Sequence, residues 1–171
     1  ENQNEKISAY IDQLMHSSDL MEFSKICDHK MLNNILCRYK KVCNELHITL
    51  HADIRSNTTT FLPDSDVTSL FCNLLDNAVE ASTHIKDAYI EINAAKREHT
   101  PFIIITMINS CASNPFTPNG KLVSSKPEPQ AHGFGIKSIE KIVHKYDGNM
   151  QMYYEESSST FHTIIMLKRN E

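Results

Sequence analysis

The chain has 171 residues, enough for one domain with its own hydrophobic core, so it is not a small scaffold that needs disulfides or metals to fold. Hydrophobic residues make up 40% and charged residues 22%, which excludes a disordered or fibrous chain. The formal net charge is −4 and no basic block stands out, which argues against nucleic acid as the main partner. The five scattered cysteines indicate neither a disulfide framework nor a zinc site, and a reducing cytoplasm is the simplest setting.

The N-terminal half of the chain alternates between helix and strand patterns. Apolar residues recur every three or four positions over residues 7–15 and again over residues 31–46, which predicts a short helix that needs a partner and a longer packed helix. From His47 to Ile54 apolar and polar residues alternate, as in a half-buried strand. After a loop, acidic residues and an available capping side chain predict a helix over about residues 64–84.

Two strands are expected next, at residues 88–95 and 102–109, and the second is so apolar that we expect it to be covered on both faces. Thr106 interrupts this run, and no segment is long enough to span a bilayer. Residues 110–131 hold four of the six prolines and predict a long loop of the kind that usually has a function. A helix from His132 and a final hairpin complete an α+β layer, with helices on one face of a largely antiparallel sheet.

The helix over residues 64–84 is the most informative segment, because it is apolar over most of its circumference and must be largely buried. One polar stripe runs along it at spacing i, i+3, i+4 and i+7, formed by Asn73, Asp76, Asn77 and Glu80. The simplest interpretation is a solvated face, but two asparagines lower helix propensity and offer short neutral oxygen ligands. Such ligands suit Mg²⁺, which completes its shell with water and phosphate oxygens.

A second signal is the sequence His132-Gly133-Phe134-Gly135 at a helix start. Two glycines let the backbone approach a ligand closely, and the free N–H groups of the first turn, together with the helix dipole, favour phosphate. The glycines could instead serve only the geometry of a turn. Taken with the asparagine-bearing helix and the long loop between them, the motif predicts a nucleotide site.

Residues 70–82, Leu-Phe-Cys-Asn-Leu-Leu-Asp-Asn-Ala-Val-Glu-Ala-Ser, closely resemble the N box of sensor histidine kinases, in the GHKL ATPase superfamily that includes gyrase, MutL and the heat-shock chaperones. Residues 132–139 resemble its second glycine box, and both are most similar to the peptide-quorum and Nat-type sensor kinases. The resemblance covers about residues 25–168. It implies a Bergerat-type α/β sandwich that binds ATP and Mg²⁺ beneath a lid and passes the γ-phosphoryl group to a histidine.

The resemblance also implies roles for single residues. Asn77 would bind Mg²⁺, Asn73 would lie at the phosphates, where hydrolysing relatives have a glutamate base, and Asn109 would accept a hydrogen bond from adenine. The lack of that glutamate fits transfer to a side chain rather than to water. The remaining phosphate contacts would come from the lid and the glycine box: Lys126, His132, Gly133, Phe134, Gly135, Ile136 and Lys137.

Where the wider family has Asp-x-Gly-x-Gly after the central strand, this chain has Asn-Ser-Cys-Ala-Ser at residues 109–113. A neutral acceptor makes a weaker hydrogen bond than a carboxylate, so we expect weaker ATP affinity. This departure leaves open a second interpretation, a degenerate nucleotide-binding or dimerisation module that signals without phosphotransfer. A soluble serine kinase of the anti-sigma type is a third, although the helical pattern in residues 5–16 speaks against it.

The resemblance places this chain within a larger protein. Residues 25–171 would be the ATP-binding catalytic domain, with a lid at about 110–131, and residues 1–24 the end of a helical hairpin used for dimerisation. The acceptor of the subgroup is a His followed by Asp, a pair that does not occur here, so we expect it upstream of Glu1. The whole protein would be a dimeric bacterial membrane sensor with a response regulator as partner, this domain being cytoplasmic and reaching the membrane only through an upstream segment.

Overall fold

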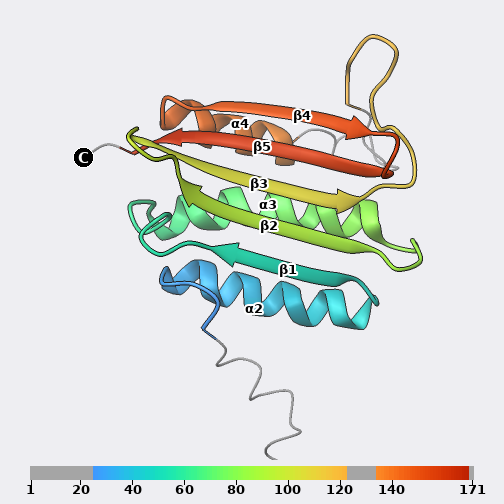
Figure 1. The fold of residues 1–171 in the computed structure, drawn as a ribbon, viewed down its shortest axis with the longest axis horizontal. Coiled ribbons are helices and arrows are strands. Elements are labelled where there is room, and N and C mark those ends of the chain that lie inside the picture. The colour runs from blue at the N-terminus through green and yellow to red at the C-terminus, as the bar shows by residue number, and fades with distance from the viewer. Residues whose placement is uncertain (1–24, 123–133, 170–171) are drawn as a thin grey trace, which may run out of the picture.

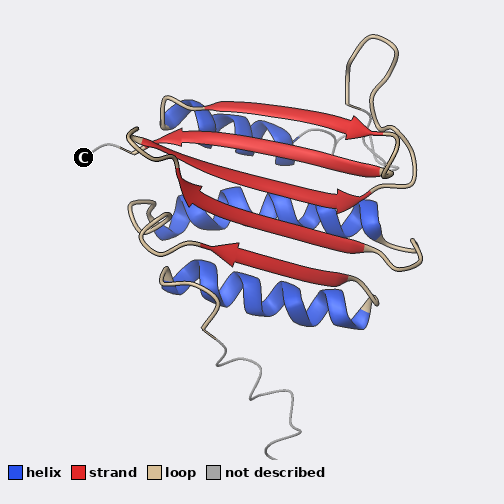
Figure 2. Cartoon of the chain, viewed as in Figure 1, coloured by secondary structure: helices blue, strands red, loops and turns tan. Residues whose placement is uncertain are grey.

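The structure, a computed structural model, describes residues 25–122 and 134–169. The predictions for the N-terminal helix of residues 7–15 and for Lys126, His132 and Gly133 therefore lie outside the described residues. Within them, one five-stranded sheet carries three helices on one of its faces (Figures 1 and 2).

The helices and strands predicted over these residues are all present, with nearly the predicted bounds. In chain order they are α2 (Lys30–Glu45), β1 (Thr49–Ile54), α3 (Asp64–Ser82), β2 (Tyr89–Lys96), β3 (Phe102–Ser110), α4 (Phe134–Lys145), β4 (Asn149–Glu155) and β5 (Thr160–Lys168). His29, eight per cent exposed, caps α2 by accepting a hydrogen bond from the Leu32 N–H and contacts the Leu62 carbonyl through Nε2. Among the described helices, none has the length and apolar character needed to cross a membrane.

The sheet has the strand order β1-β2-β3-β5-β4. Strands β1 and β2 are parallel, with α3 in the connection between them, and the other neighbouring pairs are antiparallel. Register places Ile92 of β2 beside Met107 of β3, and Ile105 of β3 beside Ile165 of β5. The largely antiparallel sheet that the sequence predicts is confirmed, with one parallel pair at the β1 edge.

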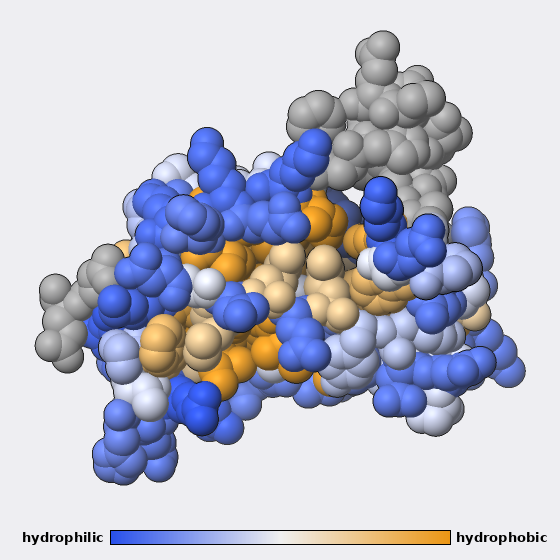
Figure 3. All heavy atoms as spheres, turned by 90° about the horizontal axis from the view of Figure 1, so that it is seen from above, coloured by the Kyte–Doolittle hydropathy of each residue, from blue (hydrophilic) through white to orange (hydrophobic). Residues whose placement is uncertain are grey.

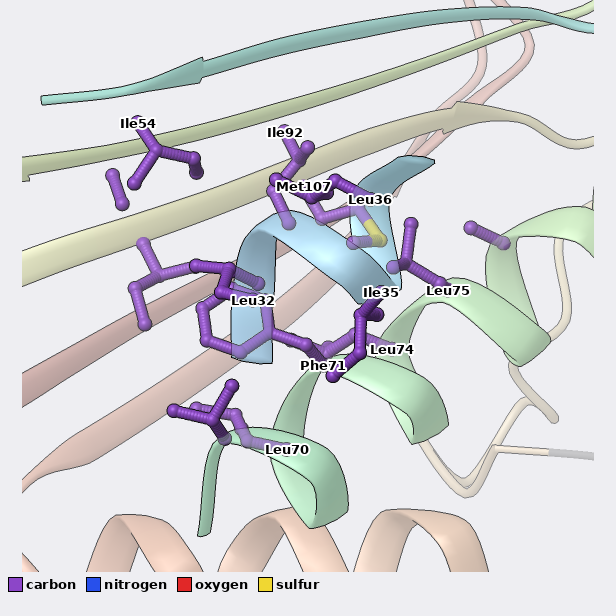
Figure 4. Close-up of a cluster of buried hydrophobic side chains, with 14 of the residues drawn as sticks. Leu32, Ile35, Leu36, Ile54, Leu70, Phe71, Leu74, Leu75, Ile92 and Met107 are labelled. Atoms are coloured by element: carbon purple, nitrogen blue, oxygen red, sulfur yellow. The ribbon is translucent and has the colours of Figure 1, made fainter. Parts of the chain in front are cut away.

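The hydrophobic core lies between the sheet and the helices. Alternate residues of the central strands point into it, since successive side chains of a strand face opposite sides. Figure 4 shows side chains of α2, α3 and the sheet meeting there, including Leu36, Leu75, Ile92 and Met107. Burying one such side chain completely contributes roughly 1.5–3 kcal/mol. The amphipathic patterns of α2 and α3 thus explain why each helix lies with its apolar face against the sheet.

The prediction that residues 102–109 form a strand covered on both faces is wrong for the described chain. The helices lie on one face only, and the residues of β3 that point the other way, such as Ile104 and Ile108, are only partly buried. Their cover comes from side chains of neighbouring strands, among them His162, which pairs with Ile108 in register and stacks on Tyr153. Seen from above, toward the β4 edge, apolar surface lies between polar side chains (Figure 3).

Candidate functional site

Helix α3 begins at Asp64, as predicted, but without the side-chain cap that the sequence suggested. Pro63 occupies the N-cap position and makes no side-chain hydrogen bond to the helix. Two acidic residues in the first turn, Asp64 and Asp66, lie at the positive end of the helix dipole. Eight of the nineteen residues of α3 are buried, so the helix is held rigidly between α2, α4 and the sheet.

Two asparagines of α3 meet the first turn of α4. The Asn73 side-chain Nδ2 donates to the Ser69 carbonyl at 2.5 Å, which turns its Oδ1 toward α4. A β-carbon placed on Gly135 would lie 3.0 Å from Asn73 Oδ1 and 3.8 Å from Asn77 Oδ1. The structure therefore brings together Asn73, Asn77 and Gly135, and a side chain at position 135 would crowd the Asn73 amide.

The side chain of Asn77 is half-buried and makes no hydrogen bond to any described residue. Its amide oxygen is therefore available to a ligand beside the first turn of α4. In the part of the chain that the structure describes, no cluster of three His, Cys, Asp or Glu side chains could hold a metal ion. A divalent cation here would have Asn77 as a protein ligand and would need water or phosphate oxygens for most of its shell, which fits Mg²⁺.

The predicted polar stripe of α3 divides in the structure. Asp76 accepts a hydrogen bond from the hydroxyl of Tyr39 at 2.6 Å and so points toward α2, away from Gly135. Burial, followed by this hydrogen bond, raises the pKa of Tyr39 well above its ordinary value. Asp76 thus joins two helices, whereas Asn73 and Asn77 face the glycine turn.

Asn109 lies on the helix-facing side of β3 and is only 4% exposed. Its Nδ2 donates to the Ser110 carbonyl at 2.9 Å, whereas its Oδ1 accepts no hydrogen bond from the described residues. The same carbonyl accepts a hydrogen bond from the Ser82 hydroxyl at 3.0 Å, so Asn109 lies near the last turn of α3. Along α3 this position is about 8–14 Å from Asn77 and Asn73. Asn109 offers a buried neutral acceptor at the far end of the same helix.

The described part of the predicted loop, residues 110–122, contains more regular structure than the sequence predicts. Ser110 still belongs to β3, and Phe116 and Leu122 form an isolated antiparallel bridge around a turn. The ring of Phe116 lies 5.8 Å from that of Phe161, which is the register partner of Asn109 on β5. The predictions from the sequence do not include this aromatic pair beside Asn109. Its signal in the sequence is a lone Phe within a segment of prolines, serines and asparagines.

The other predicted phosphate contacts are placed only in part. The backbone of Phe134 begins α4, Ile136 is half-buried and Lys137 is exposed in the same turn.

A surface depression lies elsewhere, on the open face of the sheet, lined by polar side chains of β1 and β2 that include His51, Asp53 and Glu91. That depression is separated by the sheet from the site on the helix side.

Comparison with known proteins agrees with this fold. The GHKL domain family matches residues 63–167. The catalytic domain of the histidine kinase ThkA is similar in structure, with 14% identity, a TM-score of 0.62 and coverage of 82% of this chain and 91% of that chain. The mycobacterial sensor histidine kinase MprB is 14% identical, with a TM-score of 0.60 and coverage of 83% of this chain and 96% of that chain. The Acinetobacter baumannii histidine kinase AdeS is also 14% identical, with a TM-score of 0.57 and coverage of 99% of this chain and 82% of that chain. No curated protein sequence matches significantly. At these identities the structural likeness concerns the fold.

Proposed function

Because this chain belongs to the GHKL domain family, we propose that it is the ATP-binding catalytic domain of a two-component sensor histidine kinase. Its reaction is transfer of the γ-phosphoryl group of Mg·ATP to a histidine outside this sequence. The observation that carries the proposal is the meeting of Asn73 and Asn77 with the first turn of α4 at Gly135. A glycine, two amide oxygens and a helix N-terminus together suit a phosphate chain with its cation.

The residues on the α3 side of the site favour transfer to a side chain over hydrolysis. Asn73 carries no carboxylate, and a neutral amide is too weak a base to take a proton from water. Asn77 would hold Mg²⁺, which supplies charge neutralisation when bound. The free N–H groups of the first turn of α4 would bind phosphate oxygens, so this chain contributes mainly positioning and electrostatic stabilisation.

Recognition of the base would depend on Asn109. Its unpaired Oδ1 can accept a hydrogen bond from the adenine amino group, while Nδ2 stays on the Ser110 carbonyl. A neutral acceptor forms a weaker bond than a carboxylate, so we expect ATP dissociation constants between about 1 μM and 1 mM. The same family membership supports a dimeric full-length kinase with an upstream membrane sensor, a lid over the nucleotide and a response regulator as partner.

A calorimetric titration of ATP and a non-hydrolysable analogue tests this proposal. The wild-type chain should bind both, with an affinity that depends on Mg²⁺, and Asn77→Ala should weaken binding in the presence of Mg²⁺ only. Asn34→Ala, at an exposed position in the first half of α2, is the matched control and should bind like wild type. No heat and no thermal shift with several millimolar ATP would overturn the proposal.

One observation favours a second candidate, a nucleotide-binding module that signals without phosphotransfer. Residues 109–113 contain neither the acid nor the glycines that the wider family has after its central strand. The two candidates differ in one measurable property, because only a kinase labels an acceptor. A peptide with a His-Asp acceptor helix of this subgroup, incubated with labelled ATP and the chain, should become labelled. Tight ATP binding without any labelling would favour the module.

A further inference from the structure

Helices α3 and α4 are joined a second time, far from Gly135, by one buried carboxylate. The side chain of Asp66 is 9% exposed, and its Oδ2 accepts two hydrogen bonds of 2.6 Å. One comes from the ammonium group of Lys145, the last residue of α4, and the other from the hydroxyl of Tyr146 just after it. The ring of Phe61 packs edge-on against that of Tyr146 at 5.6 Å. We call Asp66, Lys145 and Tyr146 the α3–α4 clamp.

The clamp and the candidate site lie on the same face of α3. Asn73 and Asn77 follow Asp66 by seven and eleven residues, which is close to two and three full helical turns. Around the helix axis, each asparagine is therefore rotated from Asp66 by only about 20°. The face of α3 that meets α4 therefore carries the carboxylate near its start and the asparagines about 10–16 Å further along. Since Asp66 contacts the end of α4 and Asn73 its beginning, the two helices run antiparallel.

The clamp limits how α4 can move against α3. Separation of the helices would leave Asp66 buried without its partners, and an uncompensated buried charge is strongly unfavourable. The end of α4 is also fixed to the sheet, because the Lys168 N–H donates to the Tyr146 carbonyl at 2.9 Å. At the other end, Gly135 passes so close to Asn73 that a small slide of α4 would change the space available for phosphate.

We propose that Asp66 is a positioning residue for nucleotide binding. Through Lys145 and Tyr146 it sets the register of α4 against α3, and hence the distance between the first turn of α4 and the two asparagines. The proposal rests on the proposed function for its ligand, Mg·ATP. Asp66 lies about 10 Å along α3 from Asn73 and bonds only the end of α4, so its effect on the nucleotide must pass through the position of α4.

Four variants of the clamp and one matched control test the inference by calorimetry with Mg·ATP. Asp66→Asn should weaken affinity by about tenfold or more, since small displacements in a binding site have large effects. Tyr146→Phe and Lys145→Gln should weaken the affinity severalfold. Lys145→Arg, which keeps the ion pair, should bind nearly as tightly as wild type. The control is Tyr39→Phe, which removes the same kind of tyrosine–carboxylate hydrogen bond at 2.6 Å, but between α2 and α3.

The expected result is a lower melting temperature for both Tyr146→Phe and Tyr39→Phe, with weaker nucleotide binding only for Tyr146→Phe. Unchanged affinity in Asp66→Asn and Tyr146→Phe would overturn the inference and leave the proposed function standing. Equal loss of affinity in Tyr39→Phe would also overturn it, because general destabilisation would then explain the effect.

A second measurement needs no nucleotide. Amide hydrogen exchange at residues 138–142 reports how firmly α4 is held, and it should be faster in Asp66→Asn and Tyr146→Phe than in wild type or Tyr39→Phe. Wild-type exchange rates in the clamp variants would overturn the inference whatever the calorimetry shows. Absence of ATP binding by wild type would instead overturn the proposed function, and the exchange rates would still decide whether Asp66 holds α4.

Discussion

Gly135 shows at the scale of one residue how close two helices must come at the candidate site. A methyl group there would lie 3.0 Å from Asn73 Oδ1, so Gly135→Ala should displace that amide or α4. We predict about a tenfold loss of Mg·ATP affinity, or ~1.4 kcal/mol. Calorimetry on Gly135→Ala, Asn73→Ala and the double variant measures it. In the Asn73→Ala background the added methyl has room, so a second full loss of affinity there would contradict the steric explanation.

Gly148 is the position where the backbone itself leaves no room for a side chain. A β-carbon there would collide with the Met166 carbonyl and would come within 3.0 Å of the Val143 carbonyl. Because both obstacles are backbone atoms, we predict that Gly148→Ala lowers the free energy of unfolding by roughly 2–4 kcal/mol. Urea denaturation measures this, with Asn149→Ala at the next, exposed position as control. A change within about 0.5 kcal/mol would contradict the predicted clash.

At the scale of secondary-structure elements, the α3–α4 clamp should make stability depend on pH at both extremes. Burial alone would raise the pKa of Asp66, but hydrogen bonds from Lys145 and Tyr146 outweigh it and hold this pKa below its ordinary value of 3.8. The contribution of Asp66 to the free energy of unfolding is therefore complete when the pH is above the ordinary pKa of 3.8. It is lost as the pH falls through the lower pKa of the folded state. Burial, followed by the hydrogen bond to Asp66, raises the pKa of Tyr146 from 10.0 to about 12. Its contribution is complete below pH 10 and is lost as pH rises toward 12.

Denaturation of wild type and two variants measures these contributions. The difference in unfolding free energy between wild type and Asp66→Asn should be constant near neutral pH and should shrink below about pH 4. The difference between wild type and Tyr146→Phe should shrink above about pH 10. Asp147→Asn is the acid-side control, because its carboxylate is 70% exposed and its 3.4 Å contact with Lys168 is solvated. A flat difference for Asp66→Asn down to pH 3 would contradict a lowered pKa.

The sequence predicts the elements well because their signals are local. The spacing of Asn73 and Asn77 is enough to place both on one face of α3, and the change of period after His47 is enough to locate β1. Contacts between distant residues carry no such signal. Asp66 and Lys145 are 79 positions apart, and nothing in either segment reveals their ion pair. The direction of Asp76 likewise depends on Tyr39 of another helix.

The β3 strand shows the same limit at the scale of the sheet. An almost continuous apolar run is typical of a strand covered on both faces, yet the described helices cover only one. The apolar residues on the other face are shielded by neighbouring strands on both edges, an effect that depends on strand order rather than on sequence pattern. Strand order is set by pairings across the whole chain, so it could not be predicted from the run itself.

At the scale of the molecule, the described residues form two layers, one of helices and one of strands, and neighbouring residues of β3 can test this directly. Ile105 points into the helix layer and is 1% exposed, whereas Ile104 points to the open face and is partly exposed. Threonine keeps the branched β-carbon that strands favour, so Ile→Thr changes mainly the polarity of the environment it enters. Only at position 105 must the new hydroxyl be buried among apolar side chains.

We therefore predict that Ile105→Thr lowers the free energy of unfolding by roughly 2–4 kcal/mol and Ile104→Thr by about 1 kcal/mol or less. Urea denaturation of both variants measures the difference, with the same dependence of unfolding free energy on urea concentration used for both. The pair is its own control, because the two positions lie on one strand and carry the same substitution. Equal losses would mean that the open face is as dry as the helix face, and the sheet would then need a second covering layer.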